Sequence, residues 1–275
     1  MYQQKVIPVS VLRVYQDRVE SRDDLLAVEE PLEIRLGFGP LDNRVERNLA
    51  VTMRTPGHDE ELVLGFLLSE GIVRRAGDVL RIFHCEKVKS PEARGNVVRV
   101  ELSPDFEWYE GAFQRNFYMT SSCGVCGKTS LEAVQAACPF PVQSNRFQPK
   151  PEIVFSLEDS LKKHQAVFAA TGGLHAAALF SSSGELILVR EDIGRHNALD
   201  KLIGAAAKRE MIPLAHHIIL LSGRLGFELV QKAVMAGAGA LVALGAPSSL
   251  AQSLAQQYGL TLIGFLREGR YNQYI

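Results

Sequence analysis

The sequence predicts an α/β protein in which a smaller, β-rich α+β domain precedes a three-layer α/β domain. Two patterns indicate this. The first half consists mainly of short strand-like segments, whereas the second half alternates short apolar strands with helices. Between them lies a polar, proline-bearing segment that is typical of a linker. We therefore expect an N-terminal domain at 1–138, a linker at 139–155 and a C-terminal domain at 156–275.

The N-terminal domain is expected to be built from strands and one helix. The run 47–54 alternates between apolar and polar residues, as a half-buried strand does. In the segment 59–69 an apolar helical face is supplied by Leu62, Leu64, Phe66, Leu67 and Leu68, and Gly71 is expected to end the helix. Cys85 lies inside a strand and is expected to be a core thiol. We also expect strands at 5–14 and 31–36 and a hairpin of 78–88 with 95–102.

The C-terminal domain is expected to begin with a helix at 157–168, capped by Ser156. A hairpin and then alternating helices and strands follow, and this order predicts a largely parallel sheet in a three-layer arrangement. The stretch 233–266 has no charged residue, but glycines and a proline interrupt it, so it is typical of covered strands and not of a membrane span. We expect strands at 175–180, 185–190, 217–221, 240–244 and 260–266, and helices at 195–208, 228–236 and 249–258.

The composition is that of an ordinary water-soluble chain. The 275 residues are 47% hydrophobic and 22% charged, with a formal net charge of −1, which argues against a general nucleic-acid-binding surface. The first residues contain no apolar run of the kind found in secretory signals. Four scattered cysteines in a chain of this length are typical of a reducing compartment. We therefore expect a cytoplasmic protein that binds neither membranes nor nucleic acid.

The most distinctive stretch is TSSCGVCGK at 120–128. It places Cys123 and Cys126 two residues apart, with a glycine after each, so that both sulfurs can share one disulfide, one metal ion or one transferred sulfur atom. A capping-box pattern directly after it predicts a helix whose positive end faces the cysteines. That end, with Lys128 and Arg115 nearby, is expected to lower a thiol pKa from about 8.5 towards neutrality. The loop is therefore suited to sulfur chemistry.

Other functions of the two cysteines stay open at this point. A structural zinc site commonly uses two Cys-x-x-Cys pairs, and this chain has one. Cys138 follows the predicted helix, and Cys85 comes from a separate strand, so neither completes a ligand set easily. A thioredoxin-like redox pair would begin a helix within a βαβ unit, whereas the preceding sequence here is aromatic and irregular. An inert loop with chance cysteines is the remaining alternative.

Polar residues gather at the strand ends and helix starts of the C-terminal domain, which is where α/β sheets bind ligands. Glycines there allow close backbone approach, arginines offer planar donors for phosphate, and helix N-termini add amide donors. Glycines that only connect elements and histidines satisfied in the core are the alternative interpretation. Together these residues predict a pocket for a phosphate-bearing heterocyclic ligand. The candidates are Gly172, Gly173, His175, Asp192, Arg195, His196, Ser222, Arg224, Phe265, Leu266, Arg267, Glu268, Gly269 and Arg270.

Six segments resemble a known family, the FdhD formate dehydrogenase accessory sulfurtransferases. The resemblance runs in order over about three quarters of the chain, and its C-terminal segments are the most specific. The matching segments are GFLLSEGI (65–72), SSCGVCG (121–127), TGGLHAAAL (171–179), EDIGRHNALDKLIG (191–204), SGRLGFELVQKAVMAG (222–237) and LTLIGFLREGR (260–270).

The resemblance implies a sulfur carrier. Such a protein accepts persulfide sulfur from an IscS-like cysteine desulfurase. It passes the sulfur to a molybdenum (or tungsten) bis-pterin guanine dinucleotide cofactor, molybdenum-bis(molybdopterin guanine dinucleotide), which is cargo, before the cofactor enters formate dehydrogenase. By position, Cys123 matches the persulfide-carrying cysteine and Cys126 its partner, and 265–270 matches the cofactor-binding segment. A cytidine-deaminase-like fold, a homodimer and no tightly bound metal are also implied.

The sequence departs from the deaminases at their catalytic positions. His196 stands where a deaminase has its first zinc ligand, but Asn197-Ala198 replaces the Ala-Glu that would supply the general acid/base. Ser222-Gly223-Arg224 stands where a second cysteine pair would be. The likeness of fold therefore does not imply deamination. Two alternatives to the sulfur carrier remain: a non-catalytic cofactor chaperone whose Cys-x-x-Cys motif docks the cofactor or a metal, and a zinc-dependent deaminase-like hydrolase.

Overall fold

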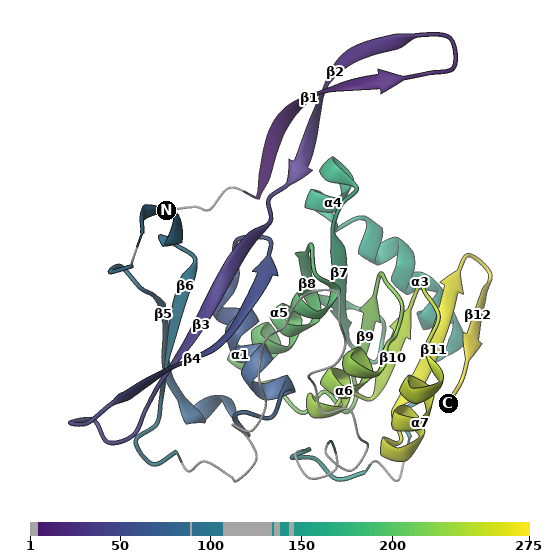
Figure 1. Ribbon diagram of the computed structural model, residues 1–275. Coiled ribbons are helices and arrows are strands. Elements are labelled where there is room, and N and C mark those ends of the chain that lie inside the picture. Colours follow the sequence, from purple (N-terminus) through teal and green to yellow (C-terminus); the bar gives the residue numbers. More distant parts are fainter. Residues whose placement is uncertain (1–4, 89, 107–133, 135–137, 143–145) are drawn as a thin grey trace.

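Two sheets of four and six strands stand on either side of a pair of helices, and a separate two-stranded hairpin projects from one end (Figure 1). This is a computed structural model. It describes residues 5–88, 90–106, 134, 138–142 and 146–275. None of the described helices has the length and apolar character needed to cross a membrane.

The four-stranded sheet has the order β4-β3-β6-β5, with β3 parallel to β6 and the other pairs antiparallel. Alternate residues of its central strand, Leu32, Ile34 and Leu36, are fully or almost fully buried. The expected hairpin is confirmed as β5 and β6, although both strands are shorter than predicted. The elements of this part are β3 (Glu30–Phe38), β4 (Val45–Arg54), α1 (Asp59–Ser69), η1 (Ala76–Asp78), β5 (Val79–His84), η2 (Pro91–Ala93) and β6 (Val97–Leu102).

Cys85 differs from its predicted role as a core thiol. It follows β5 directly and is half-buried, because the hairpin lies at the edge of its sheet. Burial raises the pKa of the Cys85 thiol, and the neighbouring guanidinium of Arg35 opposes this shift.

The projecting hairpin consists of β1 (Val6–Val14) and β2 (Val19–Ala27), which pair antiparallel over their whole length (Figure 1). The sequence predicts the first strand but not the second. The reason is that β2 reads VESRDDLLA, whose central polar run lacks apolar alternation. Most of its side chains are exposed, so no buried face imposes such a pattern.

The six-stranded sheet has the order β12-β11-β10-β9-β7-β8. Only β9, β10 and β11 are parallel neighbours, so the prediction of a largely parallel sheet is wrong. Strand β7 pairs antiparallel with both β8 and β9, and β12 turns back on β11 after Gly269, whose φ is 75°. The strands are β7 (His175–Phe180), β8 (Leu186–Asp192), β9 (Ile218–Leu221), β10 (Ala240–Ala243), β11 (Thr261–Arg267) and β12 (Arg270–Gln273).

Both faces of this sheet are covered, which confirms the three layers. Along β7, Ala177 and Leu179 belong to one core, whereas Ala176, Ala178 and Phe180 belong to another, as the two-residue period of a strand requires. The first core includes residues of α5, α6 and α7, and the second includes those of α3. These helices are α3 (Pro151–Lys162), α5 (Arg195–Lys208), α6 (Phe227–Met235) and α7 (Ser249–Tyr258).

Helix α3 begins earlier than predicted. The expected helix at 157–168 with Ser156 as its cap is replaced by α3 and a separate short helix, α4 (Ala166–Thr171). Pro151 occupies the first turn of α3, where its missing N–H costs nothing, and Ser156 lies inside the helix with its hydroxyl donating to the Ile153 carbonyl. The proline therefore starts a helix within the segment predicted as linker, and α3 crosses the predicted boundary at 155/156.

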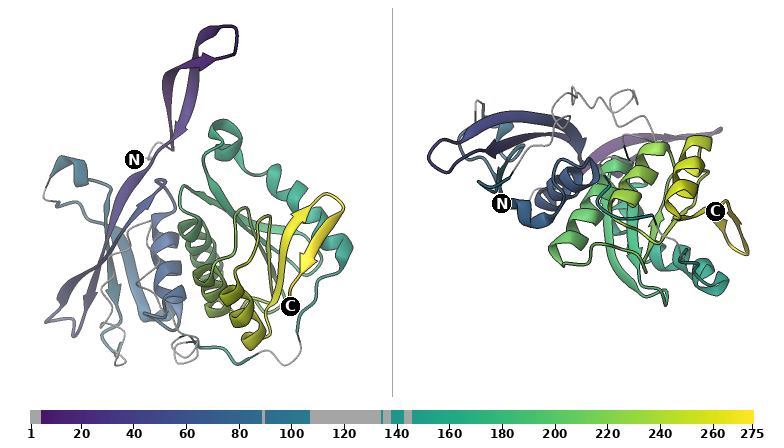
Figure 2. Two further views of the ribbon diagram at one scale, coloured as in Figure 1. Left: turned by 45° about the vertical axis from the view of Figure 1, so that its right-hand side comes forward. Right: turned by 90° about the horizontal axis from the view of Figure 1, so that it is seen from below.

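Helices α1 and α5 lie side by side between the two sheets (Figure 2). Their contact depends on Gly65 and Gly204. A Cβ atom at Gly65 would overlap the carbonyl oxygen of Asp200, and one at Gly204 would overlap that of Glu61. The two backbones therefore touch directly, which only glycine permits.

Buried ion pairs cross the same seam. The ammonium of Lys232 lies 3.0 Å from Asp200 Oδ2 and 2.9 Å from Ser69 Oγ, and it also contacts Glu70 at 2.8 Å. These side chains are nearly or fully buried except for Glu70, which is partly buried. Burial opposes the charge of Lys232, but Asp200 and Glu70 outweigh it and raise the pKa of Lys232 above its ordinary value. Breaking one partner would leave an uncompensated buried charge.

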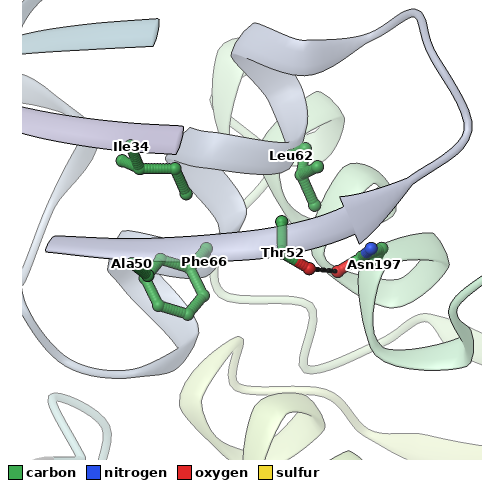
Figure 3. Close-up of a pocket in the computed structure, with 6 residues that line it drawn as sticks. All are labelled: Ile34, Ala50, Thr52, Leu62, Phe66 and Asn197. Carbon is green, nitrogen blue, oxygen red and sulfur yellow. Dashed lines mark hydrogen bonds between the residues drawn. The ribbon is translucent and has the colours of Figure 1, made fainter. Parts of the chain in front are cut away.

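A small cavity of about 10 Å³ lies in this seam (Figure 3). At its rim the Thr52 hydroxyl donates to Asn197 Oδ1 at 3.1 Å, which links β4 to the start of α5. Such a volume holds about one water molecule, so this cavity belongs to the packing and is not a ligand site. Its lining consists of Ile34, Ala50, Thr52, Leu62, Phe66 and Asn197.

We expect Gly204→Ala to lower the free energy of unfolding by about 3 kcal/mol, because the added methyl group forces the two helix backbones apart. Urea denaturation followed by circular dichroism measures this. Gly77→Ala is the matched control, since a Cβ there meets nothing within 4 Å and should change stability by less than about 0.5 kcal/mol. Equal stabilities of the two variants would contradict the glycine-dependent contact.

Candidate functional site

The candidate site lies at one end of the six-stranded sheet, where β9, β10 and β11 finish beside the start of β7. Figure 1 shows α4, the start of β7 and the turn between β11 and β12 at this end. Hydrogen bonds join the strand ends in sequence. Ser222 N donates to the Ala176 carbonyl at 3.0 Å, Gly245 N to that of Gly223 at 3.0 Å, and Phe265 N to that of Gly245 at 3.1 Å. A continuous backbone floor therefore runs from β7 to β11.

Glycines allow the backbone segments of this floor to pack closely. A Cβ at Gly245 would come within 2.8 Å of the Gly223 carbonyl, and one at Gly264 within 2.9 Å of Pro247. Gly223 lies against the imidazole of His175, where a Cβ would be 3.4 Å from Nδ1. These glycines therefore let the strand ends and the loops that follow them pack closely together. Phe265 adds an exposed aromatic ring at the end of the floor, on a backbone with φ of 55° that is uncommon for a non-glycine residue.

Cationic side chains border the floor. Arg195 and His196 begin α5, and Arg224 precedes α6; both arginines are exposed, and neither has an ion-pair partner in the described part of the chain. His175 is half-buried beside them, and burial, followed by the charges of Arg195 and His196, lowers the pKa of His175. The structure thus brings His175, Arg195 and His196 together.

His196 has an acidic partner that the sequence does not single out. Its Nε2 lies 2.9 Å from Glu228 Oε2, in the first turn of α6, and this hydrogen bond lowers the pKa of Glu228. An acidic residue in the first turn is ordinary for any helix, so its position alone carries no functional signal. Only the packing of α6 beside α5 reveals the pair.

Asp192 lies under the floor instead of at its surface. Its carboxylate has no exposure to solvent and accepts from Thr55 N, Gly194 N and the ammonium of Lys201 at 3.2, 2.8 and 2.6 Å. Asn197 is also buried, and its amide donates to the Met53 carbonyl at 2.7 Å. The structure therefore uses both residues to hold the turn before α5 against the N-terminal sheet.

The segment after β11 divides between core and surface. Leu266 is fully buried against α3, whereas Glu268, Gly269 and Arg270 are exposed in the turn to β12. The guanidinium of Arg267 donates to the Leu244 carbonyl at 2.7 Å, which holds it beside the end of β10. The side chains of Arg267, Glu268 and Arg270 are therefore accessible to a ligand, whereas that of Leu266 is not.

The glycines before β7 follow the short helix α4. Gly172 ends the helix with φ of 66°, and Gly173 N donates to Thr171 Oγ1 at 3.3 Å. Glu191 holds α4 in place, because its carboxylate accepts from Val167 N and Phe168 N at 3.1 and 2.8 Å. Both glycines are exposed. Ser222 is committed to the floor, since its hydroxyl accepts from Ala176 N at 2.9 Å.

The predicted sulfur site, Cys123 and Cys126 with the capping box after them, lies outside the described residues. Among the residues that are described, no group of three or more histidine, cysteine or acidic side chains is placed to hold a metal ion. Cys138 is partly buried, and its sulfur lies 3.5 Å from the Phe140 carbonyl.

The fold and this edge define a class: a mixed α/β protein whose exposed arginines and partly buried histidines border a glycine floor at the end of its larger sheet. The model of the FdhD/NarQ family matches residues 27–275. The chain therefore belongs to the FdhD/NarQ family.

Curated relatives agree over almost the whole chain. A protein named sulfur carrier protein FdhD from Mycobacterium tuberculosis is 49% identical over 262 residues, which cover 94% of this chain and 92% of the relative. One from Streptomyces coelicolor is 47% identical, covering 96% and 92%, and one from Sulfurisphaera tokodaii is 41% identical, covering 97% and 95%. The crystal structure of a formate dehydrogenase accessory protein from Desulfotalea psychrophila superposes with a TM-score of 0.74, covering 98% of this chain and 97% of that one; at 22% identity this likeness concerns the fold alone.

A second concavity, of about 320 Å³, lies away from this edge at the start of α1. Its acidic residues are all paired: Asp59 with the buried Arg54, Glu60 with Lys208, and Glu61 with Arg190. It is therefore a polar part of the seam between the sheets. Its lining consists of Gly57, His58, Asp59, Glu60, Glu61, His84 and Lys208.

The pairing of Glu61 predicts an acid-sensitive seam. Burial raises the pKa of Glu61, but hydrogen bonds from Arg190 and His58 outweigh it and lower the pKa from 4.5 to about 2. A lowered folded-state pKa stabilises the protein fully above about pH 4.5, and this contribution is lost as the pH falls towards 2. We expect Glu61→Gln to lower the free energy of unfolding by about 2 kcal/mol at pH 7 and to flatten its decline between pH 5 and 2.

Denaturant titrations at a series of pH values measure this. Glu60→Gln is the control, because the Glu60–Lys208 pair is largely exposed and should contribute less than about 0.5 kcal/mol. If the free energy of unfolding of Glu61→Gln fell between pH 5 and 2 as steeply as that of the wild type, the Glu61–Arg190 pair would not stabilise the fold.

Proposed function

We propose that this protein is a sulfur carrier for formate dehydrogenase. It takes persulfide sulfur from a cysteine desulfurase and delivers it to the molybdenum (or tungsten) bis-pterin guanine dinucleotide cofactor before the cofactor is inserted. The observation that carries the proposal is its 41–49% identity, over nearly the whole chain, to proteins named sulfur carrier protein FdhD. The Cys-x-x-Cys motif at Cys123 and Cys126 supplies the matching chemistry.

The first step is a thiol–persulfide exchange. The Cys123 thiolate attacks the terminal sulfur of the donor persulfide, the donor S–S bond breaks, and the donor cysteine leaves as a thiolate. Cys123 then carries the sulfur as a persulfide. Attack by Cys126 on the inner sulfur of that persulfide would release hydrosulfide towards the metal of the cargo and leave a Cys123–Cys126 disulfide, which a cellular dithiol must reduce before the next cycle.

The cargo-binding role belongs to the sheet edge. The exposed guanidinium groups of Arg195 and Arg224 suit the phosphates of a dinucleotide, because planar guanidinium donors match phosphate oxygens. The exposed ring of Phe265 offers a stacking surface for a base. We also propose that the protein is a cytoplasmic homodimer and that it binds formate dehydrogenase directly.

A cytidine-deaminase-like fold for the C-terminal domain is part of the same proposal. The supporting observation is a hairpin of β7 and β8 that lies beside three parallel strands, β9, β10 and β11. A helix connects each of these parallel strands to the next. Deaminase chemistry is not proposed. Asn197 is buried in the seam and the Ser222 hydroxyl is bound to the backbone, so the residues at these positions hold the structure together.

Incubation with a cysteine desulfurase and cysteine should add about 32 Da to the wild-type protein, the mass of one sulfur atom, and Cys123→Ala should abolish the gain. Intact-protein mass spectrometry measures it. Cys85→Ala is the control and should retain the gain. A persulfide that persists in Cys123→Ala would refute the assignment. If the double variant Cys123→Ala/Cys126→Ala still activated formate dehydrogenase in cells, the protein would be a cofactor chaperone instead.

Guanosine diphosphate is a simple probe of the cargo site. We expect Arg195→Ala and Arg224→Ala each to weaken its binding roughly tenfold, because each removes a charge-assisted contact to phosphate. Isothermal titration calorimetry at constant salt measures this. Arg13→Ala, an exposed arginine on the projecting hairpin, should leave the affinity unchanged. An equal loss in all three variants would indicate a general charge effect and no specific site.

A further inference from the structure

Glu228 places an accessible carboxylate at a site that is bordered mainly by cationic side chains. It lies in the first turn of α6 and keeps 43% of its side-chain exposure. The hydrogen bond from His196 lowers the pKa of Glu228, and the charges of Lys232 and Arg195 lower it further, so the carboxylate is ionised at neutral pH. A carboxylate is an unfavourable neighbour for phosphate, and its presence here therefore needs another explanation.

Most of this carboxylate is free to accept hydrogen bonds. An ionised carboxylate accepts only, and its two oxygens together offer about four acceptor positions. His196 Nε2 lies 2.9 Å from Oε2 and occupies one of these positions. In the described part of the chain no other group donates to the Glu228 carboxylate. Oε1 and the rest of Oε2 can therefore meet a ligand that carries two adjacent N–H donors.

Two contacts hold the carboxylate in place. The hydrogen bond from His196 ties Glu228 to the first turn of α5. One turn further along α6, the buried ammonium of Lys232 lies 3.0 Å from Asp200 of α5, which fixes α6 against that helix. An acceptor that is already oriented loses little entropy when a ligand binds. Because Lys232 and Asp200 already brace the two helices, the exposed pair above them is not needed for that purpose.

Guanine carries the pair of donors that suits such a carboxylate. Its Watson–Crick edge presents N1–H and the 2-amino group side by side, and a carboxylate can accept from both at once. Hypoxanthine lacks the 2-amino group and keeps only N1–H. Adenine presents an acceptor at N1, whose lone pair opposes a carboxylate oxygen. The ligand proposed for this edge ends in a guanine, so an accessible carboxylate is favourable for its base and unfavourable only for its phosphates.

We propose that Glu228 selects the guanine base of the cargo: its carboxylate accepts from N1–H and from the 2-amino group. Arg195 and Arg224 hold the phosphates, and they precede the same two helices that carry His196 and Glu228. This inference rests on the proposed cargo-binding function and deepens it, because contacts to phosphate alone do not distinguish one base from another. The competing explanations are a structural brace between the helices and a charge that only repels the anion.

Three nucleotides with identical phosphates test the choice of base: guanosine, inosine and adenosine diphosphate. We expect the wild type to bind guanosine diphosphate about tenfold more tightly than inosine diphosphate, which lacks one charge-assisted hydrogen bond. Adenosine diphosphate lacks both and should bind about a hundredfold more weakly than guanosine diphosphate. Isothermal titration calorimetry at pH 7.5 and constant salt measures the three affinities.

Glu228→Ala separates the three explanations by the pattern of its effects. If Glu228 selects guanine, the preference for guanosine over adenosine diphosphate should fall from about a hundredfold to less than about threefold. A brace predicts an equal loss of affinity for all three nucleotides, because the site as a whole is disturbed. A repelling charge predicts an equal gain for all three. Either equal change would overturn the inference.

Glu228→Gln provides a test by gain of binding. The amide has the shape of the carboxylate but offers one acceptor and one donor, which match the 6-amino group and N1 of adenine. This variant should bind adenosine diphosphate about tenfold more tightly than the wild type does, while its affinity for guanosine diphosphate falls. Glu60→Gln is the matched control, since Glu60 pairs with Lys208 away from this edge and should leave all three affinities unchanged.

The same measurements keep this inference distinct from the proposed function. If the wild type binds none of the three nucleotides, cargo binding at this edge is refuted. If it binds all three equally, phosphate binding stands and selection of the base by Glu228 is refuted. If it prefers guanosine diphosphate and Glu228→Ala keeps the full preference, another residue selects the base and the inference is refuted as well.

Discussion

The direct backbone contact between α1 and α5 is the constraint on which the rest of the structure depends. Gly65 and Gly204 let the two helices touch without intervening side chains, and this joins the N-terminal sheet to the C-terminal one through the helix pair between them. Buried charges then find partners across the seam: Lys232 reaches Ser69 and Glu70, and Lys201 reaches the Thr55 carbonyl. If the helices separated, Lys232 would lose Ser69 and Glu70 and Lys201 would lose the Thr55 carbonyl, so several buried polar contacts would break together.

The seam also determines the shape of the candidate site. Asp192 accepts from Thr55 N on the far side of the seam and from Gly194 N at the start of α5, so the turn that presents Arg195 and His196 is held from the N-terminal sheet. The floor of the site, in contrast, comes from the strand ends of the larger sheet alone. The candidate site therefore combines cations positioned by one half of the molecule with a backbone surface supplied by the other.

The sequence predicts those elements whose ends carry start or stop signals and whose buried faces show apolar periodicity. The helices Asp59–Ser69, Arg195–Lys208 and Ser249–Tyr258 are found at their predicted bounds, because apolar periodicity and end signals agree there. Strand β2 is missed because it has no buried face, and the start of α3 because its proline also fits a linker. The gathering of His175, Arg195 and His196 follows from the expected order of strands and helices. The burial of Asp192 and the partnership of Glu228 depend on tertiary contacts that no local pattern encodes.

Ala198 shows how little the packing around the start of α5 tolerates a polar side chain. It has no solvent exposure within the core between α5 and its neighbours. A glutamate placed there would bury a carboxylate among apolar side chains, which costs several kcal/mol without a partner. A charged residue at this position would therefore separate α5 from its neighbours and open the seam.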